Sequence, residues 1–246
     1  MVRERTIQTP VEIGRHGGLS YALWVPQEPA VGAMLILHGA GSCKESHYDF
    51  ARAACSMGLA ALAFDQRGHG ESEGRMGADA VDDVVAMAAL LRDRAGAAQG
   101  RPVPLALRGS SMGGYMALVS AAPAAADAVV AICPAGSEHL LRGLRAERFE
   151  FAVDAPGLER LLAAHGADAA VAQLDCPLLI LHAEGDEQIP VEHSRTLHAA
   201  ADSERARLLV IPGGHHRSIQ HDGELQGESL RFVRRAFGAS ARRRGR

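Results

Sequence analysis

The stretch Gly109-Ser110-Ser111-Met112-Gly113, followed by Gly114, fits the pattern G-x-S-x-G. It comes directly after an apolar, β-leaning run at Val103–Leu107 and opens a helical pattern at Tyr115–Ala122. A serine on such a tight strand-to-helix turn has a strained backbone, and the residues two before and two after it must be very small. The helix N-terminus favours negative charge that develops beside the hydroxyl. We therefore expect Ser111 to be a nucleophile, although the five residues alone also fit an ordinary turn.

A serine hydroxyl is a poor nucleophile at neutral pH, so a base and an orienting acid are also required. The apolar run Pro177–Leu181 leads into His182-Ala183-Glu184-Gly185-Asp186, and the run Arg207–Ile211 leads into Pro212-Gly213-Gly214-His215-His216. Loops that follow parallel strands meet at one edge of a sheet, the edge that would also hold Ser111. The order Ser, Asp, His along the chain accompanies this type of serine turn. These positions predict that a nucleophile, an acid and a base converge.

The Gly-rich segment His38-Gly39-Ala40-Gly41 comes directly after the apolar run Ala33–Leu37. Such a loop can point a backbone N–H at the nucleophile, as an oxyanion hole requires. We expect the N–H groups of Ala40 and Met112 to stabilise a tetrahedral oxyanion. One donor of this kind is worth about 10²–10³ in rate.

Short apolar runs that end in Gly-rich or polar turns recur along the whole chain: Thr6–Ile13, Leu19–Val25, Ala33–Leu37, Leu59–Phe64, Val103–Leu107, Ala128–Cys133, Leu178–Leu181 and Arg207–Ile211. The turn Arg15-His16-Gly17-Gly18 between the first two suggests an antiparallel hairpin. From the third run onward the intervals hold helical patterns, most clearly at Asp79–Arg94. This alternation predicts an α/β fold with a mostly parallel sheet of eight strands and helices on both faces.

Two segments depart from the alternation. Residues 135–176 contain amphipathic pieces at Glu138–Arg148 and Leu158–His165, which predict either a small cap over the edge of the sheet or an ordinary set of crossover helices. Residues 239–246 carry four arginines, and we expect them to form a disordered, solvated tail. No domain boundary is evident, so we expect residues 1–246 to form a single domain.

Composition and charge exclude several classes of protein. The 246 residues include 26 Lys+Arg and 29 Asp+Glu, for a net charge of -3, which argues against a nucleic-acid surface over the whole domain. No apolar run approaches the ~18 residues of a membrane-spanning helix. No apolar segment follows the charged start MVRERTIQTP, so we expect no signal peptide and a cytoplasmic protein without a membrane partner.

The cysteines and histidines do not form a pattern that binds a metal. Cys43, Cys55, Cys133 and Cys176 are far apart and form no CxxC, so we expect reduced thiols. The chain has 12 histidines, but no HxxxH or HExxH pattern on a helix, and we expect no bound metal ion.

The motifs together resemble one superfamily. HGAG at His38–Gly41, DQRGHGES at Asp65–Ser72, GSSMGG at Gly109–Gly114, AEGDEQIP at Ala183–Pro190 and PGGHH at Pro212–His216 are similar to the α/β-hydrolase fold. Within it the pattern is most similar to the branch of serine aminopeptidase-like and monoacylglycerol lipase-like enzymes. The resemblance implies Ser111 as nucleophile, Asp186 as orienting acid, and Ala40 and Met112 as oxyanion donors. It also places a cap insertion at residues 135–176.

The base is the member of the predicted triad with a close rival. In similar sequences the pattern Pro-Gly-x-x-His makes the fifth residue the base, which is His216 here, with His215 as the alternative and His221 five residues later. The remaining polar residues near the motifs are expected to be structural. We interpret His38 as a hydrogen-bond donor that braces the oxyanion loop, and His69 as a structural residue of the next turn.

Three further residues compete for a catalytic role. Asp65 ends a strand but precedes the serine, and with Arg67 it is expected to tie its turn together through an ion pair or backbone hydrogen bonds. Glu184 and Glu187 flank Asp186, and Glu184 is expected to be a solvated loop residue. Cys43 lacks the glycines of a nucleophile turn, so we expect a small buried residue there.

These residues predict a serine hydrolase that cleaves a carboxylic ester, or a thioester, of a small molecule through an acyl-enzyme and without metal or organic cofactor. Two alternatives remain open: an acyltransferase with the same triad, and a non-catalytic hydrolase fold used for binding. The chain is expected to be a monomer or a homodimer.

Overall fold

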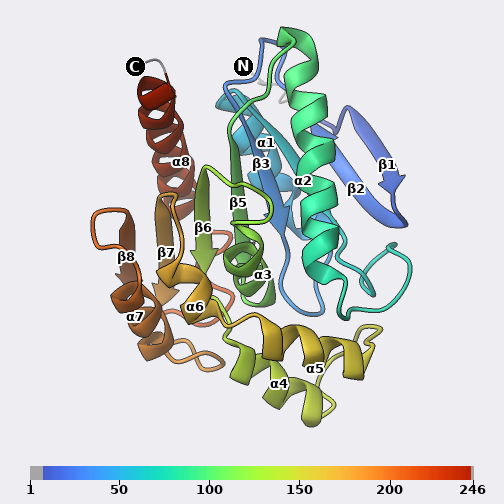
Figure 1. Ribbon diagram of the computed structural model, residues 1–246, viewed down its shortest axis with the longest axis vertical. Helices are drawn as coiled ribbons and strands as arrows, with labels where there is room; N and C mark the ends of the chain where they lie inside the picture. Colours follow the sequence, from blue (N-terminus) through green and yellow to red (C-terminus); the bar gives the residue numbers. More distant parts are fainter. Residues whose placement is uncertain (1–7, 245–246) are drawn as a thin grey trace, which may run out of the picture.

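A single eight-stranded sheet organises the chain. The computed structural model describes residues 8–244, with side chains up to Ala239. The strand order is β1-β2-β4-β3-β5-β6-β7-β8 (Figure 1), in which β1–β2 and β2–β4 are antiparallel and the other neighbours are parallel. The strands are β1 Glu12–His16, β2 Leu19–Trp24, β3 Gly32–Leu37, β4 Leu59–Phe64, β5 Leu105–Ser110, β6 Ala128–Ile132, β7 Leu178–Ala183 and β8 Ala206–Ile211. The predicted mostly parallel sheet of eight strands is confirmed.

Helices cover both faces of the sheet, which explains why its central strands are apolar throughout. In β3, Met34 and Ile36 point to the face covered by α1 and α8, and Leu35 and Leu37 point to the face covered by α2 and α3. The helices are α1 Tyr48–Ser56, α2 Ala80–Gly96, α3 Met112–Ser120, α4 Ser137–Arg145, α5 Ala155–Ala164, α6 Ala167–Ala172, α7 Val191–Ala200 and α8 Gly223–Arg244, with short 3₁₀ turns η1 Lys44–His47 and η2 Ala97–Gln99. Among the described residues no helix is long and apolar enough to cross a membrane.

The first hairpin forms with a shifted strand. The predicted strand Thr6–Ile13 is wrong, because β1 begins at Glu12 and runs to His16; Thr6 and Ile7 lie outside the described residues. Gly17 and Gly18 have φ of 57° and 82°, the left-handed values that a two-residue hairpin turn requires at both positions. These two glycines fix the turn, so Arg15 and His16 belong to the strand rather than to the turn.

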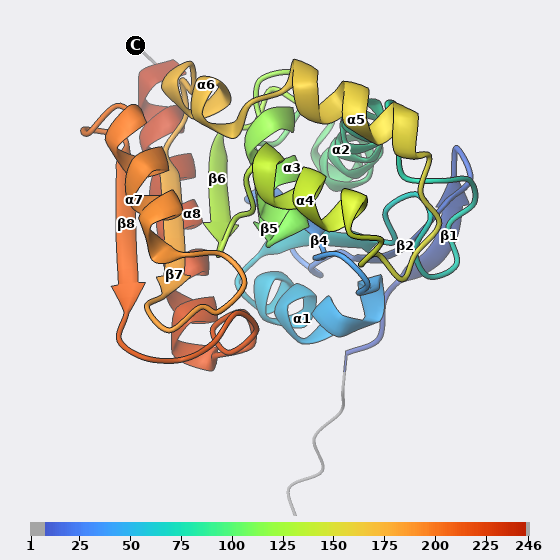
Figure 2. The same ribbon diagram turned by 90° about the horizontal axis from the view of Figure 1, so that it is seen from below.

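The segment between β6 and β7 contains α4, α5 and α6. Helices α4 and α5 pack on each other beyond the ends of the parallel strands (Figures 1 and 2), whereas α6 packs against α3 and α7. A backbone connection holds the far end of this segment: the N–H of Ala152 donates to Gly68 O at 3.0 Å, and the N–H of Met76 donates to Ala152 O at 2.9 Å. We call α4, α5 and the residues between them the cap segment, and this connection attaches it to the loop after β4.

The C-terminal residues are helical where the sequence suggested a disordered tail. Helix α8 continues to Arg244, so residues 239–244 are part of it, and residues 245–246 lie outside the described residues. Alanine and arginine are strong helix formers, and positive charge near a helix C-terminus interacts favourably with the helix dipole. The arginine run thus extends the helix instead of ending it.

Candidate active site

Ser111 lies in a strained turn between β5 and α3. Its φ is 54° and its ψ is -119°, a conformation that residues other than glycine rarely adopt. The chain passes very close to itself here: a Cβ on Gly109 would lie 2.0 Å from Gly113 O, and a Cβ on Gly113 would lie 2.2 Å from Leu37 O. The structure therefore has the strand-to-helix turn that the serine pattern predicts, and both glycines are required for it.

Asp186 and His216 lie in the loops after β7 and β8, and their side chains are hydrogen-bonded to each other. The Nδ1 atom of His216 lies 2.7 Å from Oδ2 of Asp186, and the two side chains are 6% and 0% exposed. A carboxylate only accepts, so Nδ1 carries the proton, and Nε2 of the neutral ring is free to take another. The two loops are held together by the Gly185 N–H, which donates to Gly213 O at 3.0 Å. A general base and the acid that orients it would require an arrangement of this kind.

The environment of Asp186 keeps it ionised. Burial alone would raise its pKa, but hydrogen bonds from His182, His216 and the backbone N–H groups of Ile189 and Gln188 lower the pKa well below its usual range. Both N–H groups donate to Oδ1 at 2.9 Å. Asp186 therefore presents a permanent negative charge to the His216 ring.

His182 is a part of the site that sequence reasoning missed. It is completely buried, and its Nε2 lies 2.9 Å from Ile189 O and 3.4 Å from Oδ2 of Asp186. A carbonyl oxygen only accepts, so Nε2 carries a proton, and Nδ1 accepts from the Ser194 hydroxyl at 2.6 Å. The available signal was its position at the carboxyl end of β7, four residues before Asp186.

Ser111 and His216 are not hydrogen-bonded to each other. Within the part of the chain that the structure describes, its Oγ makes no hydrogen bond, so the structure brings together Asp186 and His216 but does not link His216 to Ser111. Ser111 nevertheless lines the same cavity as Glu187 and Arg217, the immediate neighbours of Asp186 and His216. Hydrogen bonds to a nucleophile are often long without substrate and tighten when it binds.

The predicted oxyanion loop lies against the serine turn. A Cβ on Gly39 would lie 3.4 Å from the Ser111 Cβ, and Ala40 lines the cavity together with Ser111. Between residues 8 and 244 the structure has no hydrogen-bond acceptor for the backbone N–H of Ala40 or of Met112. Neither N–H is therefore occupied by a described residue, and their role as oxyanion donors stays a prediction.

His38 braces this loop through both ring nitrogens. Its Nδ1 lies 2.8 Å from Gly39 O, and its Nε2 accepts the backbone N–H of Gln66 at 2.9 Å. The Gln66 side chain returns a hydrogen bond to His38 O at 2.6 Å. Burial lowers the pKa of His38, so the ring is neutral. His38 is therefore a donor at Nδ1, as predicted, and also an acceptor at Nε2.

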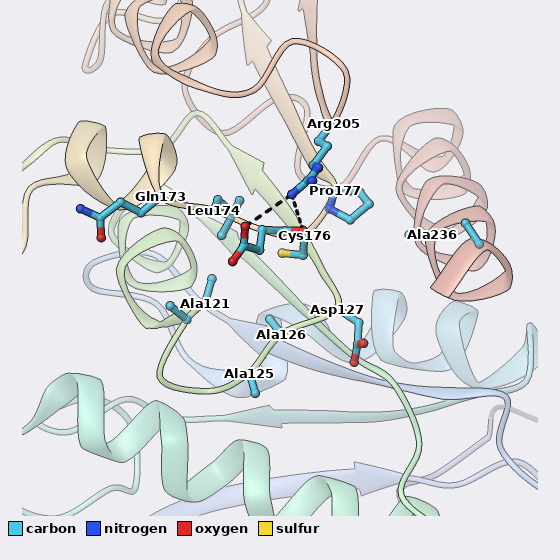
Figure 3. Close-up of a pocket in the computed structure, with 13 residues that line it drawn as sticks. Ala121, Ala125, Ala126, Asp127, Gln173, Leu174, Cys176, Pro177, Arg205 and Ala236 are labelled. Carbon is cyan, nitrogen blue, oxygen red and sulfur yellow. Dashed lines mark hydrogen bonds and ion pairs between the residues drawn. The ribbon is translucent and has the colours of Figure 1, made fainter. Parts of the chain in front are cut away.

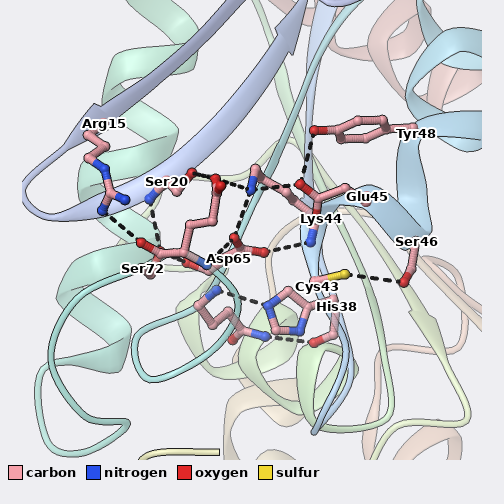
Figure 4. A network of polar contacts seen from close by, with 12 residues as sticks. Arg15, Ser20, His38, Cys43, Lys44, Glu45, Ser46, Tyr48, Asp65 and Ser72 are labelled. Carbon is pink, nitrogen blue, oxygen red and sulfur yellow. Dashed lines mark hydrogen bonds and ion pairs between the residues drawn. The ribbon is translucent and has the colours of Figure 1, made fainter.

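Asp65 is held by Lys44, the single lysine of the chain, and not by Arg67 (Figure 4). Lys44 Nζ lies 2.9 Å from Asp65 Oδ2, while the backbone N–H groups of Lys44 and Glu71 donate to Asp65 at 2.7 and 2.9 Å. Asp83 instead takes the Arg67 guanidinium through two hydrogen bonds, one of them at 2.9 Å. The expected backbone hydrogen bonds are present; an ion pair of Asp65 with Arg67 is not formed.

Of the rival residues His215, His221, Glu184 and Glu187, only Glu187 makes a hydrogen bond to the Asp186–His216 pair among the described residues. His215 is exposed, and its backbone N–H donates to Ser218 Oγ at 3.0 Å. His221 stacks on His47 with ring centroids 6.0 Å apart. Glu184 is exposed, whereas Glu187 accepts the backbone N–H of His216 at 3.1 Å.

Of two other residues, Cys43 differs from expectation and His69 agrees with it. Cys43 is half-buried rather than buried, with Sγ 3.7 Å from Ser46 Oγ. His69 stacks on Phe151 of the cap segment with ring centroids 3.8 Å apart, which agrees with a structural role. Its ring therefore helps to hold the cap segment on the loop after β4.

A cavity of about 510 Å³ opens above Ser111. Its walls come from the oxyanion loop, from α4 and the residues after it, and from the loops that follow β7 and β8. This volume is within the usual range for small-molecule sites. The cap thus forms one wall of the space in which a substrate would meet Ser111.

A second cavity of about 380 Å³ lies at the opposite edge of the sheet, where β6 and β7 begin (Figure 3). Its single thiol, Cys176, is buried, and burial raises the pKa of that thiol to about 12. Arg205 at its rim donates to Asp175 O at 2.9 Å. Without an activated nucleophile this cavity does not compete with the one above Ser111.

Comparison with known families decides the classification. The sequence model of a family described as serine aminopeptidase, S33, matches residues 28–155, slightly more than half of the chain. The chain belongs to this family. It is thereby an α/β-hydrolase of the serine hydrolase class, as the motifs suggested.

Individual relatives are similar over most of their length. A monoacylglycerol lipase from Mycolicibacterium smegmatis is 28% identical over 247 residues, covering 80% of this chain and 85% of the relative. Est1E from Butyrivibrio proteoclasticus, solved with bound ferulic acid, superposes with a TM-score of 0.72 at 19% identity, covering 89% of this chain and 96% of that one. A soluble variant of the Saccharomyces cerevisiae monoglyceride lipase gives a TM-score of 0.71 at 17% identity, covering 96% and 97%. At these identities the two structures show a shared fold.

Proposed function

We propose that the protein hydrolyses carboxylic esters of small molecules by transferring the acyl group to Ser111 and then to water. The observation that carries this proposal is the strained Ser111 turn on the floor of a cavity whose neighbouring loops hold Asp186 and His216 2.7 Å apart. Relatives named as monoacylglycerol or monoglyceride lipases support an ester rather than an amide as the substrate.

The first half of the reaction forms the acyl-enzyme. Ser111 Oγ attacks the carbonyl carbon while His216 Nε2 takes the hydroxyl proton, and Asp186 stabilises the resulting imidazolium. The carbonyl oxygen becomes an oxyanion that the N–H groups of Ala40 and Met112 stabilise. The C–O bond to the alcohol then breaks, and the alcohol leaves with the proton from His216.

The second half repeats these steps with water. His216 removes a proton from a water molecule, whose oxygen attacks the acyl carbon, and the oxyanion forms again at the same two N–H groups. Collapse of this intermediate breaks the bond to Ser111 Oγ, which recovers its proton from His216. The product is a carboxylic acid, and the enzyme returns to its starting state.

Ser110 provides a matched control for the test. Its Oγ is buried and, among the described residues, has no hydrogen-bond partner, so Ser110→Ala removes a hydroxyl one residue away at little cost. We expect Ser111→Ala to reduce kcat for p-nitrophenyl butyrate by about 10³-fold or more, because the attacking atom is lost. Wild-type protein and Ser110→Ala should both react with a fluorophosphonate probe, and Ser111→Ala should not.

Two results would overturn the proposal. One is wild-type turnover in Ser111→Ala, and the other is a folded wild-type protein that neither reacts with the probe nor hydrolyses activated esters. Product analysis with a competing alcohol distinguishes hydrolysis from acyl transfer, since an acyltransferase forms a new ester in place of the free acid.

A further inference from the structure

Three arginines line the cavity above Ser111, and each comes from a different segment. Arg142 lies on α4, Arg148 follows that helix, and Arg217 is the residue after His216. All three are exposed, and within residues 8–244 none of their guanidinium groups makes an ion pair or a hydrogen bond. Arginine stays protonated at any pH the protein experiences, so the cavity contains three positive charges without partners.

The neighbouring arginine of α4 behaves differently. Arg145 does not line the cavity, and its Nε lies 3.8 Å from Oε1 of Glu159 on α5. Arg142 and Arg145 lie on the same helix, but only Arg142 lines the cavity and only Arg145 has a carboxylate nearby. This difference makes Arg145 a natural control for Arg142.

Two carboxylates also line the cavity, but neither neutralises an arginine. Glu187 accepts the backbone N–H of His216 at 3.1 Å, and Glu150 is exposed without an ion pair to any described residue. His139 lines the cavity too, and burial lowers its pKa, so it adds no charge at neutral pH. Three positive and two negative groups leave the cavity with an excess of one positive charge, which a monoanion would balance.

The same cavity has an apolar wall. Leu140 is buried, and Phe149 and Phe151 stack with ring centroids 4.9 Å apart. Apolar surface of this kind binds hydrocarbon chains, because contact removes the apolar surface of both partners from water, which is favourable. A ligand that fills the cavity therefore needs an apolar portion as well as a negative charge.

We propose that the ester substrate carries a carboxylate at the end of a short apolar chain, and that Arg142, Arg148 and Arg217 bind this carboxylate. The proposal rests on the ester hydrolysis proposed above and specifies the substrate class of that site. Guanidinium groups pair with carboxylates through two parallel hydrogen bonds, which gives both affinity and orientation. The apolar chain would lie against Phe149 and Phe151, with its ester carbonyl at Ser111.

Two esters with the same leaving group and the same number of carbon atoms test the proposal: mono-p-nitrophenyl adipate, which is anionic, and p-nitrophenyl hexanoate, which is neutral. We expect kcat/KM for the wild-type enzyme to be about tenfold higher for the adipate. This preference should shrink when salt is raised from about 0.05 M to about 0.5 M, because salt screens exposed charges.

The arginine variants locate the effect. Arg142→Gln, Arg148→Gln and Arg217→Gln should each lower the ratio of the two kcat/KM values by about threefold to tenfold, whereas Arg145→Gln should keep the wild-type ratio. A wild-type ratio at or below one, or a ratio that none of the three substitutions lowers, overturns this proposal while hydrolysis of the hexanoate still supports the function. Failure of the function itself looks different, since neither ester is then cleaved and Ser111 does not react with a fluorophosphonate.

Discussion

The Nε2 atom of His182 lies 3.4 Å from Oδ2 of Asp186, the same oxygen that lies 2.7 Å from Nδ1 of His216. One carboxylate oxygen therefore lies between two imidazoles: that of His182, which is completely buried, and that of His216, whose side chain is 6% exposed. Together with the two backbone N–H groups on Oδ1, these contacts fix both the position and the charge of Asp186. The orientation of the His216 ring thus depends on residues that never touch the substrate.

Asp186→Asn tests this dependence. The amide has the shape of the carboxylate but loses its charge, and its NH₂ group cannot accept the hydrogen bond that His216 Nδ1 donates. We expect kcat for an activated ester to fall by about 10⁴-fold, since the ring then favours the wrong tautomer. Asp175→Asn is the control, because Asp175 is exposed at the opposite edge of the sheet. Equal activity of the two variants in steady-state assays would contradict the assigned role of Asp186.

The buried ion pair of Lys44 and Asp65 should contribute to the stability of the fold. Both side chains are buried, at 1% and 0% exposure, so Lys44→Met leaves the Asp65 charge buried without its partner. We expect the free energy of unfolding to fall by about 3–5 kcal/mol, measured by urea denaturation at neutral pH. Lys44→Met combined with Asp65→Asn should recover part of this loss, because the buried charge is removed.

Glu45 supplies the control for that pair. Its carboxylate also lies 2.8 Å from Lys44 Nζ, but it is half exposed, and Glu45→Gln should cost less than about 1 kcal/mol. If the Lys44 single and double variants unfolded at the same urea concentration, the buried charge of Asp65 would not explain the loss. Gln66, the residue after Asp65, is hydrogen-bonded to His38 at the start of the oxyanion loop, so the Lys44→Met variant is also expected to lose activity.

Much of the site could be predicted because its geometry is encoded locally. The glycines at 109 and 113 are needed by close backbone contacts, and Asp186 and His216 follow strands whose carboxyl ends meet at one edge. The preference for His216 over His215 came from a spacing in similar sequences, and the structure places the ring of His216 against Asp186.

Features that depend on tertiary packing were not accessible from the sequence. The partner of Asp65 is Lys44, twenty-one positions earlier, and no periodicity relates the two residues. The position of His182 at the end of an apolar run is a signal in the sequence, but its contact with Asp186 depends on how the loop between them folds. The predicted first strand and the predicted disordered tail were both wrong. The glycine turn sets the position of β1, and the helix-forming residues of the arginine run extend α8.

Substitution of glycine by alanine should have opposite effects on stability at Gly113 and at Gly238. A Cβ on Gly113 would lie 2.2 Å from Leu37 O, a backbone atom that cannot move aside, whereas nothing lies within 4 Å of a Cβ on Gly238 in α8. Gly113→Ala should therefore destabilise the fold by about 3 kcal/mol or more. Gly238→Ala should stabilise it by about 0.5–1 kcal/mol, because alanine favours a helix. Thermal unfolding of both variants checks the pair, and a stable Gly113→Ala protein would mean that the serine turn is less crowded than the structure shows.

The stability of the cap attachment should depend on pH through His69. Burial beside the Phe151 ring lowers the pKa of His69 to about 4, whereas an unfolded histidine titrates near 6.5. Between these values the unfolded chain binds a proton that the native protein does not, so the free energy of unfolding falls as the pH decreases through this window. The loss from this residue alone reaches about 3 kcal/mol by about pH 4.

In urea denaturation at about pH 8 and about pH 4, His69→Gln should remove that part of the pH dependence. His16→Gln, at an exposed position of β1, should follow the wild-type protein. If His69→Gln kept the full wild-type dependence, other buried histidines such as His38 and His47, whose pKa values burial also lowers, would have to account for it.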